Sequence, residues 1–203
     1  GAHKGLNVAT WNPQMPGPAP YTVPQGTVMW GGGGGIPKAP PGMYTVKVSM
    51  GSWSATQTFR LNPDPRLQPA MTDADGAAQL KMAMEVGGWT KQLYDKLAQI
   101  RDAKKQAAGL AEKTPALAAA AKVFTDRAVA VEGDMTQLQG EAGQDSLNFP
   151  GRMDNQLTEL YGGIIAAERK LGSPVTERYA DLRPMYEALM LRVTAVLGAD
   201  VTA

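Results

Sequence analysis

The stretch Asn62-Pro63-Asp64-Pro65-Arg66 divides this chain of 203 residues into two parts of different character. Short alternating runs and loops rich in proline and glycine precede it, whereas apolar residues at helical spacing follow it. Eleven of the 15 prolines lie at or before Pro69. The sequence therefore predicts an α+β chain, with a β-module over residues 1–66 and a helical module over residues 71–203.

The β-module has one clear hairpin signal, over residues 42–61, where two alternating runs meet at Gly51-Ser52. Alternation over residues 6–11 predicts a further strand, and residues 27–30 a fourth. So few strands make only a partial immunoglobulin-like sandwich. We expect the module to lack upstream strands, or to be completed by the helices, by a second copy, or by both, because a domain of about 60 residues is marginal even when complete.

The helical module contains four apolar stripes, which predict helices that start near residues 72, 114, 151 and 176. Short connections between helices favour an up-and-down, antiparallel four-helix bundle. Gly87-Gly88 interrupts the first helix with two poor helix formers, each costing about 1 kcal/mol relative to alanine. We therefore expect a kink or a close helix contact at this pair.

Composition excludes several classes of function. The chain has no cysteine, which excludes disulfides, a thiolate nucleophile and a cysteine-ligated zinc ion. His3 is the only histidine, so no histidine-based triad or multi-histidine metal centre can form within the chain. No cofactor is predicted. The balance of +4 in the β-module is too dilute for a phosphate-binding surface, and nucleic acid is not expected as a partner.

The first residues of the chain and its longest apolar runs indicate whether it carries a signal peptide or a membrane span. Residues 162–167 form one of the longest apolar stretches, which is far shorter than the ~20 residues of a membrane span. The first residues lack the basic, apolar and small-residue pattern of a signal peptide. We therefore expect no membrane span, and a chain that begins inside a longer precursor.

No catalytic constellation stands out, so each polar group has a structural interpretation. Asp73 and Asp75 are expected to cap a helix, and the polar run over residues 152–156 to do the same. Glycines 31–35 are expected to form a flexible loop. A further set of acids is assigned to a solvated helix end: Glu132, Asp134, Glu141 and Asp145.

Three tryptophans are the candidate ligand or partner surface: Trp11, Trp30 and Trp53. Indole rings in a small β-module could form a platform for sugar rings, and the alternative is that they fill the core. No residue is assigned a catalytic, cofactor-binding or metal-binding role.

The order of several motifs resembles the C-terminal region of large bacterial proteins of the sortilin-like and BNR (Asp-box) β-propeller glycosyl hydrolase families. The motifs lie in residues 5–12, 39–48, 60–66 and 145–157, and Asp154 stands where an asparagine is commoner. The resemblance implies an exported β-propeller, followed by an immunoglobulin-like sandwich and then helices. The Asp-box blade pattern Ser-x-Asp-x-Gly-x-x-Trp does not occur in this chain, so any hydrolase site would lie upstream.

Three hypotheses of function follow. The first is a non-catalytic C-terminal accessory or scaffolding region of a larger exported, periplasmic or extracellular, β-propeller protein, with the upstream propeller as its partner and a homodimer through open sheet edges as a further expectation. The second is a carbohydrate- or protein-binding module that uses the tryptophans. The third, a hydrolase in its own right, ranks last because no acid/base pair is visible.

Overall fold

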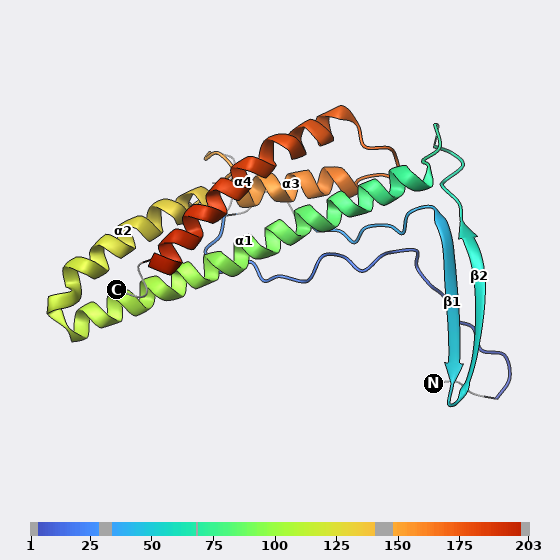
Figure 1. The fold of residues 1–203 in the computed structure, drawn as a ribbon, viewed down its shortest axis with the longest axis horizontal. Coiled ribbons are helices and arrows are strands. Elements are labelled where there is room, and N and C mark those ends of the chain that lie inside the picture. Colours follow the sequence, from blue (N-terminus) through green and yellow to red (C-terminus); the bar gives the residue numbers. More distant parts are fainter. Residues whose placement is uncertain (1–3, 29–33, 68, 141–147, 200–203) are drawn as a thin grey trace.

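The computed structural model describes residues 4–28, 34–67, 69–140 and 148–199 (Figure 1). Over these residues the chain is a mixed α+β structure with a two-stranded antiparallel sheet and four helices. The elements are β1 (Gly42–Met50), β2 (Trp53–Leu61), α1 (Asp73–Lys113), η1 (Pro115–Leu117), α2 (Ala118–Met135), α3 (Met153–Ile165) and α4 (Ser173–Ala199). His3, Trp30, Glu141, Asp145 and glycines 31–33 lie outside the described residues.

The predicted hairpin is confirmed. Strands β1 and β2 pair in a continuous antiparallel register that places Tyr44 opposite Phe59 and Met50 opposite Trp53. Gly51 opens the turn with φ of 58°, in the region that glycine adopts without a steric penalty. The apolar and polar residues that alternate in the sequence therefore lie on opposite faces of this hairpin.

The predicted strand over residues 6–11 is wrong. This stretch is extended but pairs with no strand among the described residues, and Leu6 and Val8 are 86% and 81% exposed. Alternation stabilises a strand only where a neighbour covers its apolar face, and none does so here. The described part of the predicted fourth strand makes a single bridge, Val28 with Gln137. The immunoglobulin-like sandwich is thus not confirmed, because two strands are present.

Helix α1 starts where the sequence predicts. The Thr72 hydroxyl accepts a hydrogen bond from the Asp75 backbone N–H at 3.1 Å, and the Asp75 carboxylate accepts one from the Thr72 N–H at 3.2 Å. This capping box satisfies two backbone donors that the helix itself leaves free. The helix then continues for 41 residues, about 60 Å at 1.5 Å per residue.

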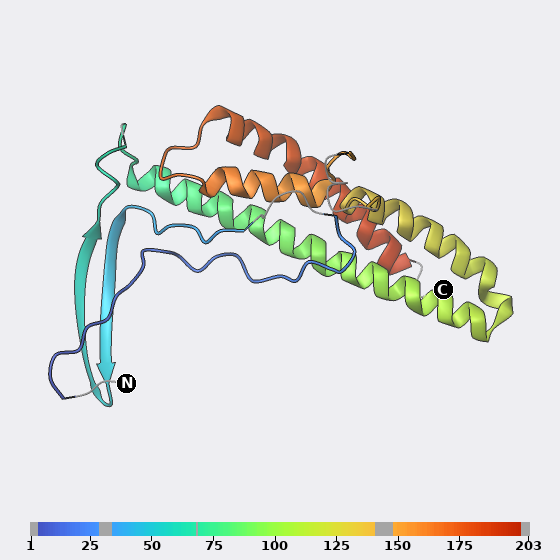
Figure 2. The same cartoon turned by 180° about the vertical axis from the view of Figure 1, so that it is seen from behind.

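The other three helices cover one long side of α1 (Figures 1 and 2). Helices α2 and α3 follow one another along α1 and both run opposite to it, whereas α4 returns in the direction of α1. The predicted alternation of four antiparallel helices is therefore not confirmed. Because α1 is more than twice as long as α2, a single neighbour leaves half of its apolar face uncovered, and α3 packs on that half.

The proline-rich segment lies along the helices instead of in a sheet. We call residues 13–28 and 34–39 the strap: it runs out beside α1 and returns to β1 (Figure 1). The Tyr21 ring packs 5.3 Å from that of Tyr94, and the Tyr161 hydroxyl donates to the Gly35 carbonyl at 2.9 Å. Prolines suit such a segment because it forms no regular ladder of backbone hydrogen bonds. The division into modules at residue 66 stays a prediction.

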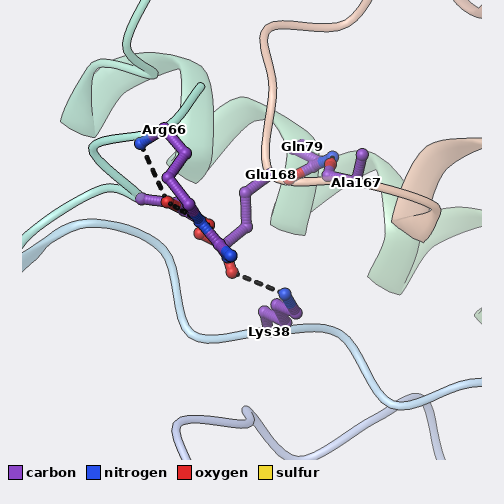
Figure 3. A network of polar contacts seen from close by, with 6 residues as sticks. Lys38, Arg66, Gln79, Ala167 and Glu168 are labelled. Carbon is purple, nitrogen blue, oxygen red and sulfur yellow. Dashed lines mark hydrogen bonds and ion pairs between the residues drawn. The ribbon is translucent and has the colours of Figure 1, made fainter. Parts of the chain in front are cut away.

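Polar contacts fix the place where the strap, the hairpin and the helices meet (Figure 3). The Lys38 ammonium lies 2.7 Å from the Glu168 carboxylate, and the Gln79 side chain donates to the carbonyls of Ile164 and Ala167 at 2.7 and 2.8 Å. Next to this network, Arg60 of β2 makes a two-pronged ion pair with Asp73 of α1. The base of the hairpin is therefore tied to α1 and to the end of α3.

Gly87 makes a close contact, but its tightest partner is the strap and not a neighbouring helix. A Cβ added at Gly87 would lie 2.0 Å from Cγ of Pro18, whereas one added at Gly88 would meet nothing within 4 Å. We expect Gly88→Ala to stabilise the chain by about 1 kcal/mol through helix propensity. Gly87→Ala should instead lower the unfolding temperature and raise amide hydrogen exchange over residues 14–28. Equal effects of the two variants would show that the strap does not pack on α1.

Candidate functional site

One face of the hairpin is apolar and largely uncovered. We call it the hairpin face; the register assigns to it Tyr44, Val46, Val48, Met50, Trp53, Ala55, Gln57 and Phe59. Val46, Val48 and Met50 are 45%, 56% and 67% exposed. The opposite face carries small polar residues together with Met43, Lys47 and Arg60. A contiguous apolar patch on an exposed strand pair is a feature of interaction surfaces.

The tryptophans lie at opposite ends of the hairpin face. The Trp11 ring packs on Tyr44 and Phe59 at 5.5 and 6.0 Å between ring centroids, near the base. Trp53 stands at the tip beside Met50, six residues from Phe59 and thus about 20 Å away at 3.3 Å per residue. Trp11 and Trp53 are 46% and 55% exposed and do not lie side by side. Their role in ligand binding stays a prediction.

A buried polar cluster lies where α2 ends and α3 begins. We call it the polar junction; its members are Arg101, Lys104, Glu132, Thr136, Asp154 and Asn155. Glu132 is only 3% exposed, and its carboxylate lies 2.7 Å from Nε of Arg101 and 2.6 Å from Nζ of Lys104. The assignment of Glu132 to a solvated helix end is therefore wrong. Glu132 lies four residues after Ala128, on the buried stripe of α2.

The two basic partners keep Glu132 ionised. Burial raises the pKa of this carboxyl, but the hydrogen bonds from Lys104 and Arg101 outweigh burial, and the net shift is downward. Arg101 also donates to the carbonyl of Gln25 in the strap. The ion pairs of Glu132 therefore join α1 to α2, and the hydrogen bond from Arg101 joins α1 to the strap.

Asp154 has the opposite environment. Its side chain is fully buried, and Oδ1 accepts hydrogen bonds from the Asn155 backbone N–H at 2.7 Å and the Asn155 amide at 3.1 Å. The Thr136 hydroxyl lies close by and favours the ionised form, though its geometry falls short of a hydrogen bond. Burial dominates and raises the pKa of Asp154 to about 6.

The polar junction does not have the arrangement of a hydrolytic site. A glycoside-cleaving pair needs two carboxyl groups that flank an accessible substrate, one of them ionised and one protonated. Glu132 is held by two cations, and Asp154 has no exposed surface. Three further acids that the sequence singled out and the structure describes have structural partners too: Asp75 caps α1, Asp73 pairs with Arg60, and Asp134 lies 2.8 Å from Arg192.

In the described part of the chain, no group of three or more His, Cys, Asp or Glu side chains is placed to hold a metal ion. No described helix is both long and apolar enough to cross a bilayer.

Comparisons with known proteins gave no match. No family model, no curated protein and no solved structure matches the chain. The function is therefore inferred from the geometry of this chain and from the resemblance of its motifs.

Glu132→Gln should destabilise the chain by about 3 kcal/mol, because it leaves Arg101 and Lys104 partly buried without their anion. Asp126→Asn is the matched control on the same helix, since its ion pair with Lys122 is exposed on both sides. Chemical denaturation at neutral pH measures both. Losses of equal size would show that the polar junction contributes no more than a surface ion pair.

Asp154→Asn tests the buried carboxyl through its pH dependence. The folded pKa of about 6 lies above the unfolded value of 3.8, so the folded state binds the extra proton and the wild type loses stability as pH rises from about 4 to about 6. The variant has no such loss. Its stability relative to wild type should therefore increase over this window, by up to about 3 kcal/mol. A difference that is constant from pH 4 to pH 7 would contradict the buried, proton-binding state of Asp154.

Proposed function

We propose that this chain is a non-catalytic accessory region of a larger exported bacterial protein, in which a helical body supports a β-hairpin that completes the sheet of adjoining polypeptide. The observation that carries the proposal is the uncovered hairpin face. The adjoining polypeptide, following the resemblance of the motifs, is the upstream β-propeller of a sortilin-like or BNR glycosyl hydrolase protein, and β1 and β2 are two strands of a partial immunoglobulin-like sandwich.

The energetics of a hairpin support this role. An isolated two-stranded hairpin is at best marginally stable in water and needs a third strand or a packed face. Here β1 and β2 project away from the helices, which they meet only at one end (Figures 1 and 2). Among the described residues, only Trp11 packs its ring on the aromatic residues of the hairpin face. The rest of this face is available to a partner.

The attachment at the base supports the role as well. The ion pair of Arg60 with Asp73 and the pair of Lys38 with Glu168 hold the hairpin against the helical body. A hairpin held at one end presents its tip and its face in a defined direction, which lowers the conformational entropy lost on docking. The helical body then acts as the support.

A binding module is the second candidate, and the exposure of Trp53 favours it. In that case the isolated chain binds soluble oligosaccharides, and tryptophan fluorescence reports the binding. Trp53→Ala would abolish this signal while it left the helical body folded. A homodimer through the hairpin edges is the third outcome, and light scattering on the purified chain distinguishes it.

Paired substitutions on the two faces of the hairpin test the docking proposal. Val48→Asp places a charge on the hairpin face, and Thr56→Asp places the same charge on the opposite face. We expect Val48→Asp to weaken binding to the upstream region, supplied as a separate polypeptide, at least tenfold in titration calorimetry, because docking would bury an unpaired charge. Thr56→Asp should bind as the wild type does.

Circular dichroism should show full helix content in both variants. Equal binding by Val48→Asp and wild type would exclude the hairpin face as the docking surface. Hydrolysis of aryl glycosides by the purified chain, lost in Asp154→Asn, would overturn the non-catalytic assignment.

A further inference from the structure

A cavity of about 590 Å³ lies between α3, the start of α4 and the loop residues that precede α3, and no residue of the hairpin lines it. Its walls include Phe149, Leu160 and Val175, so most of the lining is apolar. The volume falls within the range of about 300 to 1,000 Å³ that is typical of small-molecule sites. Such sites combine an apolar wall with a few convergent polar groups, and this cavity has both.

Two exposed side chains of opposite charge line the solvent side of this cavity, Arg178 from α4 and Glu159 from α3. Nη2 of Arg178 donates to the Gln156 side chain at 2.6 Å, which holds the guanidinium against the wall and leaves its other donors for a ligand. In the part of the chain that the structure describes, Glu159 makes no ion pair with Arg178 or with any other basic residue. The cavity therefore offers one cation and one anion that are separated.

The charges select among ligand classes. The carboxylate of a simple fatty acid would pair with Arg178 but would be repelled by Glu159. The ammonium group of a simple amine would pair with Glu159 but would be repelled by Arg178. An uncharged apolar molecule would leave both charges unmatched and partly desolvated. A ligand that carries both charges at its two ends and an apolar body between them matches all three features of the lining.

We propose that this cavity binds a short apolar peptide of two or three residues with free ends. Its carboxylate pairs with Arg178, its ammonium group pairs with Glu159, and its side chains pack on Phe149, Leu160 and Val175. A free amino acid fits less well, because its two charged groups sit on the same carbon atom while Arg178 and Glu159 are too far apart to pair with each other.

Titration calorimetry of the full chain with the dipeptide Leu-Leu tests the proposal directly. We expect binding to Leu-Leu, and about tenfold weaker binding to N-acetyl-Leu-Leu, which lacks the ammonium group, and to Leu-Leu amide, which lacks the carboxylate. Arg178→Gln should weaken binding of Leu-Leu but not of its amide. Glu159→Gln should weaken binding of Leu-Leu but not of the acetylated form.

Adjacent glycines of α3 provide a matched pair of variants. Gly163 lines the cavity, and a Cβ there would lie 4.0 Å from Val175, an ordinary contact, whereas Gly162 has nothing within 4 Å of its added Cβ and does not line the cavity. Gly163→Leu should fill the cavity and abolish binding without unfolding α3, since leucine is a better helix former than glycine. Gly162→Leu should bind as the wild type does.

Three results would overturn the proposal. The first is the absence of binding at millimolar Leu-Leu. The second is binding that Gly163→Leu leaves intact, which would place the ligand elsewhere, for example on the hairpin face. The third is preferential binding of decanoate that becomes tighter in Glu159→Gln, which would identify a site for simple anions. Docking of the upstream region through the hairpin is tested separately by Val48→Asp, because Val48 and the cavity lie on separate elements.

Discussion

The structure depends on the burial of one face of a single long helix. Leu93, Leu97 and Ile100 of α1 are fully buried, and each such side chain contributes roughly 1.5 to 3 kcal/mol. No one neighbour is long enough to cover this face, so α2, α3, α4 and the strap share it. The tandem arrangement of α2 and α3 follows from this division, and so does the route of the strap along α1.

The same division creates the polar junction. Where α2 stops and α3 starts, two helix ends with unpaired backbone groups face the middle of α1, and such ends need polar partners. Glu132, Asp154 and the residues around them lie at this place. The raised pKa of Asp154 is thus explained by helix packing, since structural networks as well as active sites shift pKa values. The hairpin face and the cavity are therefore better candidates for a functional surface than the polar junction.

Short sequence motifs predicted the structural features that depend on the conformation of a few neighbouring residues. The hairpin turn at Gly51 and the cap at Thr72 were both predicted, because each depends on the conformational preference of one or two residues. The path of the strap could not be predicted, since a proline-rich segment has no periodicity that indicates which element it packs on. The charge of Glu132 favours a solvated position, whereas its spacing along α2 places it on the buried stripe. The prediction from charge is the one that is wrong. No sequence motif predicts the cavity, because Gln156 and Arg178 come together only through the packing of α3 on α4.

Helix α3 connects these features, although it has only 13 residues. Its first turn supplies Asp154 to the polar junction, one side lines the cavity through Glu159, and Tyr161 holds the strap. Ile164 in its last turn and Ala167 just after its end accept the hydrogen bonds of the Gln79 side chain, next to the base of the hairpin (Figure 3). A ligand that stiffens α3 would therefore act on the strap and on the hairpin base through direct contacts, without a change of fold. The hairpin face and the cavity lie on separate elements, and α3 connects them through these contacts.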